Sequence, residues 1–96
     1  MYKPLPEEVE IRDSEIHGKG LFANFIIEKG RNLGMTHVYD SDMPNERIRT
    51  PLGGFLNHSQ DPNCELIKIG KYYYLITMVD IMPDEELTLK YTLYNI

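Results

Sequence analysis

Two β-rich runs separated by only two residues constrain this chain more than any other feature of its sequence. The runs are 64–69 and 72–79, and the residues between them are Gly70 and Lys71. A two-residue connection joins neighbouring antiparallel strands, and glycine at its first position suits a type II′ turn because that position has positive φ. The sequence therefore predicts a tight β-hairpin in this part of the chain.

Glycine, proline and asparagine divide the rest of the chain into short pieces. The polar stretch 40–51, with its two prolines, indicates a loop or one short helical turn. No segment has a long apolar stripe with a 3.6-residue period, so we expect a mainly β fold with little helix. The further strands predicted from β-rich or alternating runs are 8–13, 21–23, 33–38 and 86–91, with turns at 18–20, 28–30 and 82–84.

Composition limits the class of protein and its partners. Ninety-six residues suffice for one domain, 1–96, and not for a second core. Cys64 is the only cysteine, which excludes an internal disulfide and a cysteine-rich zinc site and favours a reducing, intracellular compartment. The net charge of −5 opposes binding to nucleic acid and predicts a basic protein or peptide as partner. No apolar run matches a signal peptide or a membrane span, so we expect no membrane association.

Three clusters of residues could carry chemistry, and each also has a structural explanation. Residues 17–23 contain a Gly-Lys-Gly turn, 57–64 form a dense polar loop, and 85–91 form a terminal strand that ends in Tyr91. An ordinary turn, a loop rich in Asn, Asp and Pro, and a core tyrosine would account for them. The histidines and the cysteine match no compact ligand spacing, so no metal site is predicted. Nothing around the serine or cysteine of the polar loop supplies the base of a nucleophilic triad.

In this order the clusters resemble the SET-domain family of protein-lysine methyltransferases, and the resemblance spans nearly the whole chain. Residues 16–23 are similar to the family's opening Gly-x-Gly motif, 54–64 to its Asn-His-Ser loop, and 80–91 to its Glu-Glu-Leu-Thr segment with the following tyrosine. The resemblance implies a β-clip of short strands in small sheets. The C-terminal segment would be threaded as a pseudoknot beneath the loop that holds Asn57 and His58.

The resemblance also implies a function and a set of site residues. The function is transfer of methyl groups from the cofactor S-adenosylmethionine to a lysine side chain of a protein, either a histone-like basic tail or another protein. The turn would lie along the methionine part of the cofactor, Asn57 would bind its polar end, and the His58 backbone its adenine. Tyr91 would be the catalytic residue, because its hydroxyl would orient the lysine amine. The residues assigned to the cofactor are His17, Gly18, Lys19, Gly20, Asn57 and His58.

Three positions depart from the family pattern. Gly54 stands where the family often has arginine, Asp84 replaces a glycine in the last turn, and Leu89 occupies a position that is often Phe or Tyr. Aspartate tolerates left-handed φ better than most residues, so we expect the turn at Asp84 to form. The residue at position 89 leaves open how many methyl groups are transferred.

Two segments of the family pattern are short or missing. The insert before the Asn-His loop is reduced to 40–51, and no cysteine-rich segment follows Tyr91. The chain is therefore similar to minimal viral or bacterial forms, for which the cytoplasm or, for a viral protein, the host nucleus is expected. A small domain with so little covering surface favours a homodimer in which a second subunit covers part of the channel or core. The same departures leave open an alternative function, a catalytically weak or inactive SET-like module for binding or assembly.

Overall fold

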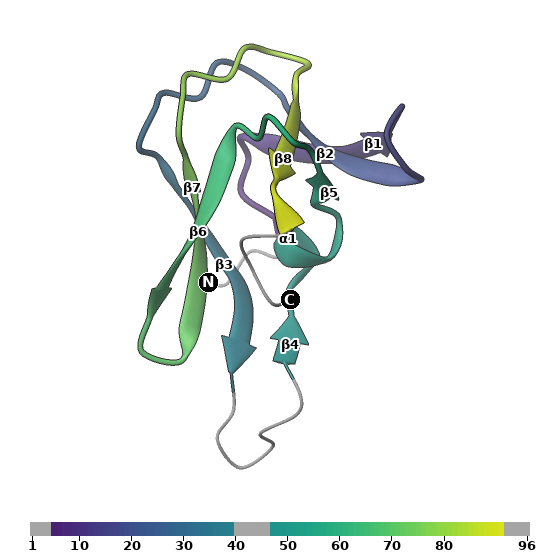
Figure 1. Ribbon diagram of the computed structural model, residues 1–96. Coiled ribbons are helices and arrows are strands. Elements are labelled where there is room, and N and C mark those ends of the chain that lie inside the picture. The colour runs from purple at the N-terminus through teal and green to yellow at the C-terminus, as the bar shows by residue number, and fades with distance from the viewer. Residues whose placement is uncertain (1–4, 40–46, 92–96) are drawn as a thin grey trace.

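The computed structural model describes residues 5–39 and 47–91, and these form two four-stranded sheets (Figure 1). The first sheet has the strand order β1-β2-β8-β5 and the second the order β4-β3-β7-β6. The prediction of a mainly β fold with small sheets is confirmed. The elements are β1 (Val9–Asp13), β2 (Lys19–Ala23), β3 (Asn32–Tyr39), β4 (Arg47–Arg49), α1 (Pro51–Gly54), β5 (Asn57–His58), β6 (Cys64–Ile69), β7 (Tyr72–Thr77) and β8 (Glu86–Leu89).

The predicted hairpin is the β6–β7 pair. Its register runs from Cys64 opposite Thr77 to Ile69 opposite Tyr72, which leaves two residues in the turn. Gly70 has φ of 61°, and Lys71 is not among the described non-glycine residues with positive φ, as a type II′ turn requires. The β-branched and aromatic residues of both strands favour this pairing.

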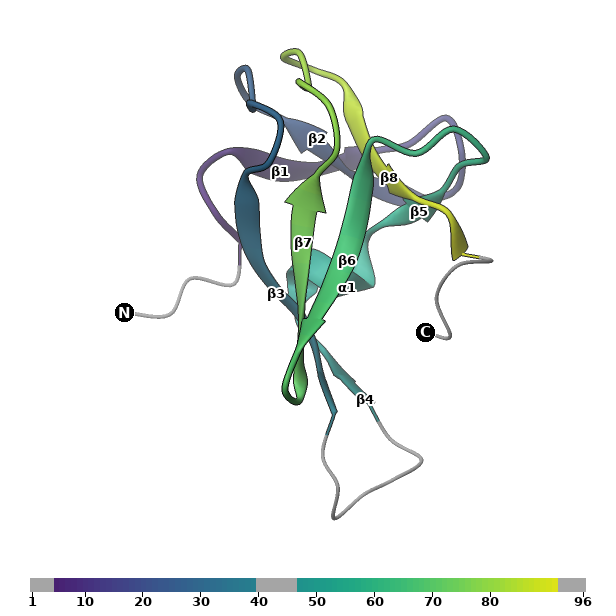
Figure 2. The same cartoon turned by 60° about the vertical axis from the view of Figure 1, so that its left-hand side comes forward.

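The C-terminal strand β8 lies between strands from two distant parts of the chain. Leu87 pairs with Leu21 of β2 in antiparallel orientation, whereas Thr88 pairs with Asn57 of β5 in parallel orientation. Both views show β8 beside β2 and β5 (Figures 1 and 2). The Asn63 side chain adds bonds to the same strand, because its Nδ2 donates to the Glu86 carbonyl at 2.8 Å and its Oδ1 accepts from Thr88 N at 2.9 Å. The third sequence cluster is thus held against the second.

Some of the predicted boundaries are wrong. The turn predicted at 18–20 ends at Gly18, because the β1–β2 register continues to Asp13 opposite Lys19. Strand β8 ends at Leu89 and excludes Tyr91. β7 ends at Thr77 and not at residue 79.

The stretch 40–51, predicted as a loop or one short helical turn, contains β4, which pairs with β3, and its last residue begins α1. Residues 40–46 lie outside the described residues. Asp84 has φ of 70°, which confirms the left-handed turn expected there. Pairing with neighbouring strands, which local sequence does not encode, sets these limits.

The core fills the space between the two sheets. Leu21, Leu75, Ile81, Leu87 and Leu89 have no exposed surface and come from both sheets and the segment that joins them. Burying side chains of this size supplies most of the driving force for folding. The described residues contain no helix with the length and hydropathy of a membrane span.

The short helix α1 packs directly on β3. Thr50 is its N-cap, and the hydroxyl accepts from Gly53 N at 3.3 Å and donates to the Met35 carbonyl at 2.6 Å. A Cβ at Gly53 would overlap the Thr36 carbonyl oxygen, so this contact requires glycine. The contact brings the loop before β5 close to the inner side of the second sheet.

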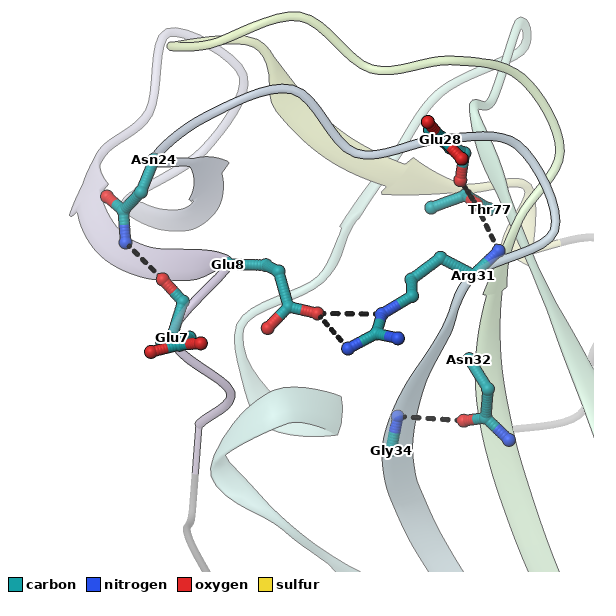
Figure 3. Close-up of polar contacts among 8 residues, drawn as sticks. All are labelled: Glu7, Glu8, Asn24, Glu28, Arg31, Asn32, Gly34 and Thr77. Carbon is teal, nitrogen blue, oxygen red and sulfur yellow. Dashed lines mark hydrogen bonds and ion pairs between the residues drawn. The ribbon is translucent and has the colours of Figure 1, made fainter.

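An ion pair joins the segment before β1 to the segment before β3 (Figure 3). The Arg31 guanidinium donates from Nε and Nη2 to Glu8 Oε2, with both distances 2.8 Å. The Thr77 hydroxyl accepts from Arg31 N at 2.9 Å and donates to the Glu28 carbonyl at 2.7 Å. These bonds fix the 24–31 loop between the sheets.

Candidate functional site

The side-chain amide of Asn57 is the point at which three distant segments meet. Its Nδ2 atom lies 3.0 Å from the His17 carbonyl oxygen, 3.1 Å from the Lys19 carbonyl oxygen and 2.8 Å from a Glu86 carboxylate oxygen. The Ser14 hydroxyl oxygen is 3.1 Å away. An amide nitrogen carries two hydrogens, so the site has more acceptors than this donor can satisfy at one time. The structure therefore brings residues of all three sequence clusters together.

Glu86 places a negative charge in this network. The Ser14 hydroxyl lies 2.7 and 2.9 Å from its two carboxylate oxygens, and Asn57 donates to Oε2. Glu86 is half-buried, and none of the ion pairs among the described residues involves it. The φ of Gly20 is not positive, so its backbone conformation does not require glycine. A Cβ there would overlap the Glu86 carboxylate, and this close contact explains why the position is glycine. The site is thus rich in acceptors, and its negative charge is held by neutral donors.

The Gly-Lys-Gly turn presents backbone atoms to Asn57, and its side chains lie elsewhere. Gly18 has φ of 48°, and its carbonyl oxygen accepts from Ser14 N at 2.8 Å. The Lys19 ammonium forms an exposed ion pair with the Asp13 carboxylate. The His17 side chain is also exposed. Of the turn residues predicted to bind cofactor, His17 and Lys19 contact Asn57 through their carbonyl groups. Gly20 lies close to Asn57 because it has no Cβ, which would stand 3.2 Å from Asn57 Nδ2.

Tyr91 and His58 lie against each other just beyond β8. Their ring centroids are 5.3 Å apart, and Tyr91 N donates to His58 Nδ1 at 2.9 Å. The Tyr91 hydroxyl donates to the Leu56 carbonyl oxygen. Burial raises the pKa of Tyr91, and the opposing effect of the Arg49 charge is smaller. The phenol is therefore protonated at neutral pH.

A cavity of about 80 Å³ opens beside the Tyr91 ring, on the inner side of the second sheet. One buried water needs roughly 10–15 Å³, so the cavity is large enough for the end of an extended side chain. A Cβ at Gly54 would meet nothing within 4 Å, so the missing arginine of the family pattern leaves open space here. The cavity is lined by His37, Arg49, Gly53, Gly54, Leu56 and Tyr91.

A second opening is an acidic groove of about 410 Å³, which is lined in part by Glu86. Two of its carboxylates are already paired, Asp13 with Lys19 and Asp84 with Arg12. The groove is lined by Asp13, Glu15, Ile16, Phe22, Asp84 and Glu86. Its remaining negative charge lies next to the Asn57 network and attracts cationic ligands.

Sequence reasoning did not assign Ser14, Glu86 or Arg49 to the site. Glu86 lies within the third cluster, so the motif contained a signal for it, and Ser14 directly follows a predicted strand. No local pattern marks Arg49, because it reaches the cavity only through the pairing of β4 with β3.

Burial raises the pKa of the Cys64 thiol to about 12, which makes it a poor nucleophile. Among the described residues, no group of His, Cys, Asp or Glu side chains could hold a metal ion.

Comparisons with known proteins identify relatives of this fold. A model of the SET domain family matches residues 36–92. The fold is similar to a Plasmodium falciparum protein assigned as a histone methyltransferase, with a TM-score of 0.70 and 19% identity over 90% of this chain and 94% of that one. It is also similar to the methyltransferase domain of human PR domain-containing protein 2, with a TM-score of 0.71 and 23% identity over 88% of this chain and 76% of that one. The SET domain of the RIZ1 tumor suppressor is similar as well, with a TM-score of 0.70 and 22% identity over 96% of this chain and 74% of that one. A search of curated protein sequences finds no match.

Proposed function

Because the chain belongs to the SET-domain family, we propose that it transfers a methyl group from S-adenosylmethionine to a lysine side chain of a protein. Family membership and the similar folds support a methyltransferase in general terms. The cofactor and the lysine substrate are inferred from the site. The observation that carries the proposal is the set of acceptors around Asn57 Nδ2, which come from three distant segments.

The chemistry of these acceptors fits the cofactor. Two backbone carbonyls, one hydroxyl and the Glu86 carboxylate lie within 3.1 Å of the Asn57 amide nitrogen. Such a set suits a ligand with an ammonium group, and Glu86 adds the charge that a cation prefers. The cofactor, when bound, supplies the methyl group from its sulfonium centre. Asn57, the His17 and Lys19 carbonyls and the His58 backbone would hold it.

Tyr91 is suited to orient an amine and not to remove its proton. The raised pKa keeps its hydroxyl neutral, and donation to the Leu56 carbonyl fixes the direction of the O–H bond. The lone pairs of the oxygen remain available to accept an N–H bond from a lysine amine in the adjoining cavity. Holding the amine in one orientation lowers the barrier by restricting the geometry of approach.

Arg49 gives the cavity a positive charge that affects the substrate. A lysine must lose its proton before it can act as a nucleophile, and its ordinary pKa of about 10.4 disfavours that loss at neutral pH. A like charge in the same small cavity favours the neutral amine. Arg49 lines the cavity together with Tyr91, so it favours the reactive form of the amine. The net charge of −5 supports a basic protein as the substrate that delivers this lysine.

Calorimetric titration with S-adenosylhomocysteine and a radiolabelled methyl-transfer assay on basic proteins together test this function. The wild type is expected to bind the ligand and to label a lysine-bearing protein. Asn57→Ala should lose most of the affinity, whereas Asn24→Ala should not, because the Asn24 side chain donates to the Glu7 carbonyl, away from the site. Absence of binding by wild type would refute the cofactor assignment. Binding without transfer to any basic protein would instead favour the inactive binding module.

A further inference from the structure

The outer face of the second sheet is apolar across four strands. The inward residues of the β6–β7 pair are Cys64 opposite Thr77 and Leu66 opposite Leu75, so the alternating positions point outward. Antiparallel sheets with one solvated face normally carry polar residues there. Here the outward positions are Asn32, Met35 and Val38 of β3, Ile48 of β4, Glu65, Ile67 and Ile69 of β6, and Tyr72, Tyr74 and Ile76 of β7.

In the part of the chain that the structure describes, this outer face is exposed to solvent. Ile48, Ile67 and Ile69 are 54%, 40% and 60% exposed. In Figure 2 the strands β3, β7 and β6 lie in front of α1 and the first sheet, and no described element covers them. An apolar surface spanning several strands marks an interaction site on a soluble protein.

Charges of opposite sign stand at the two ends of the outer face. Glu65 begins the outward row of β6 at one end. At the other end is the hairpin turn, where the Lys71 ammonium lies 5.5 Å from the Tyr72 ring centroid. The outward row from position 65 to 69 spans about 14 Å, at roughly 3.4 Å per residue. The face therefore has an apolar centre, an acidic end and a basic end.

We propose that the outer face binds a second copy of this chain, forming a face-to-face homodimer. A two-fold axis between the sheets and perpendicular to the strands reverses the strand direction of one copy relative to the other. Glu65 of one subunit then lies over Lys71 of its partner, and this pairing occurs twice because the interface is isologous. Sheets pack in this way about 10 Å apart, with apolar side chains between them.

This homodimer leaves the proposed active site open. His37 and Arg49 line the Tyr91 cavity from the inner side of the second sheet, opposite the outer face. The second subunit would thus not cover the channel, unlike the dimer expected from the sequence. The inference therefore stands independently of the proposed function.

Sedimentation equilibrium over concentrations from micromolar to millimolar tests the homodimer. The wild type should reach twice the mass of one chain. Ile69→Glu should raise the dissociation constant at least ~100-fold, since each dimer would bury two unpaired carboxylates. Ile26→Glu is the matched control, because Ile26 is 52% exposed but lies in the 24–31 loop. Circular dichroism and the melting temperature of each variant establish that it is folded.

A charge exchange tests the orientation of the two copies. Glu65→Lys and Lys71→Glu should each weaken dimerisation, because each places like charges together, and the double variant should restore it. A wild type that remains monomeric throughout would overturn the proposal, even if the outer face binds another protein. Failure of the double variant to recover would overturn the antiparallel arrangement.

Discussion

Replacing Gly20 with alanine tests the packing of Glu86 at the centre of the candidate site. The new Cβ would overlap the Glu86 carboxylate, while the next contact, Asn57 Nδ2, lies 3.2 Å away and needs to move only slightly. The carboxylate would have to turn out, which breaks its bonds to Ser14 and Asn57. Hydrogen bonds to charged groups contribute roughly 1.5–3 kcal/mol each, and a half-buried group that regains water belongs at the lower end.

These contributions give a net loss of stability that can be measured. Alanine is more favourable than glycine in a strand by about 0.5–1 kcal/mol, which offsets part of the loss. The free energy of unfolding should fall by about 2 kcal/mol, with a fall of about 8–16 °C in melting temperature for a domain of this size. Urea denaturation followed by tyrosine fluorescence is the suitable assay, because the chain has seven tyrosines and no tryptophan.

A control and a double mutant separate this explanation from a general sensitivity to alanine. Gly54→Ala should leave stability unchanged or raise it by about 0.5–1 kcal/mol, because a Cβ there meets nothing within 4 Å. In a Glu86→Ala background, Gly20→Ala should cost little, because the overlapping carboxylate is gone. An equal loss of stability with and without the Glu86 side chain would refute the reasoning.

Three further predictions concern Tyr91, Arg49 and the buried Cys64. Tyr91→Phe should lower the methyl-transfer rate at least ~10²-fold without changing the affinity for S-adenosylhomocysteine, and a folded variant with the wild-type rate would exclude Tyr91 from the site. Arg49→Met should move the acidic limb of the pH–rate profile to higher pH, because loss of the positive charge favours the protonated lysine, whereas Arg49→Lys should leave the limb in place. Cys64 is 1% exposed and its pKa is raised to about 12, so the native thiol is protonated at pH 8 and should react with dithionitrobenzoate only as fast as the protein unfolds. Rapid labelling of the native protein would contradict that burial.

The sequence determined the elements that depend on neighbouring residues. The hairpin turn at Gly70 follows from a glycine between two β-rich runs, and the positive φ found there agrees with it. The turn at 82–84 follows from its proline and aspartate, and the left-handed φ of Asp84, expected from the glycine of the family pattern, is one that aspartate tolerates. Both turns are formed within a few residues, so local turn chemistry and alternation are sufficient to predict where they lie.

Only the tertiary structure decided which side chains form the site. Asn57 bonds to Glu86 across 29 positions of the chain and to Ser14 across 43, and no local pattern encodes either distance. The resemblance to a family indicated that the three clusters would meet, but it did not assign a role to Ser14 or to Arg49. Those two residues are placed by strand pairing, β1 with β2 and β3 with β4. Strand pairing between distant segments is selected by burial of the whole core, which is why a single stretch of sequence cannot specify it.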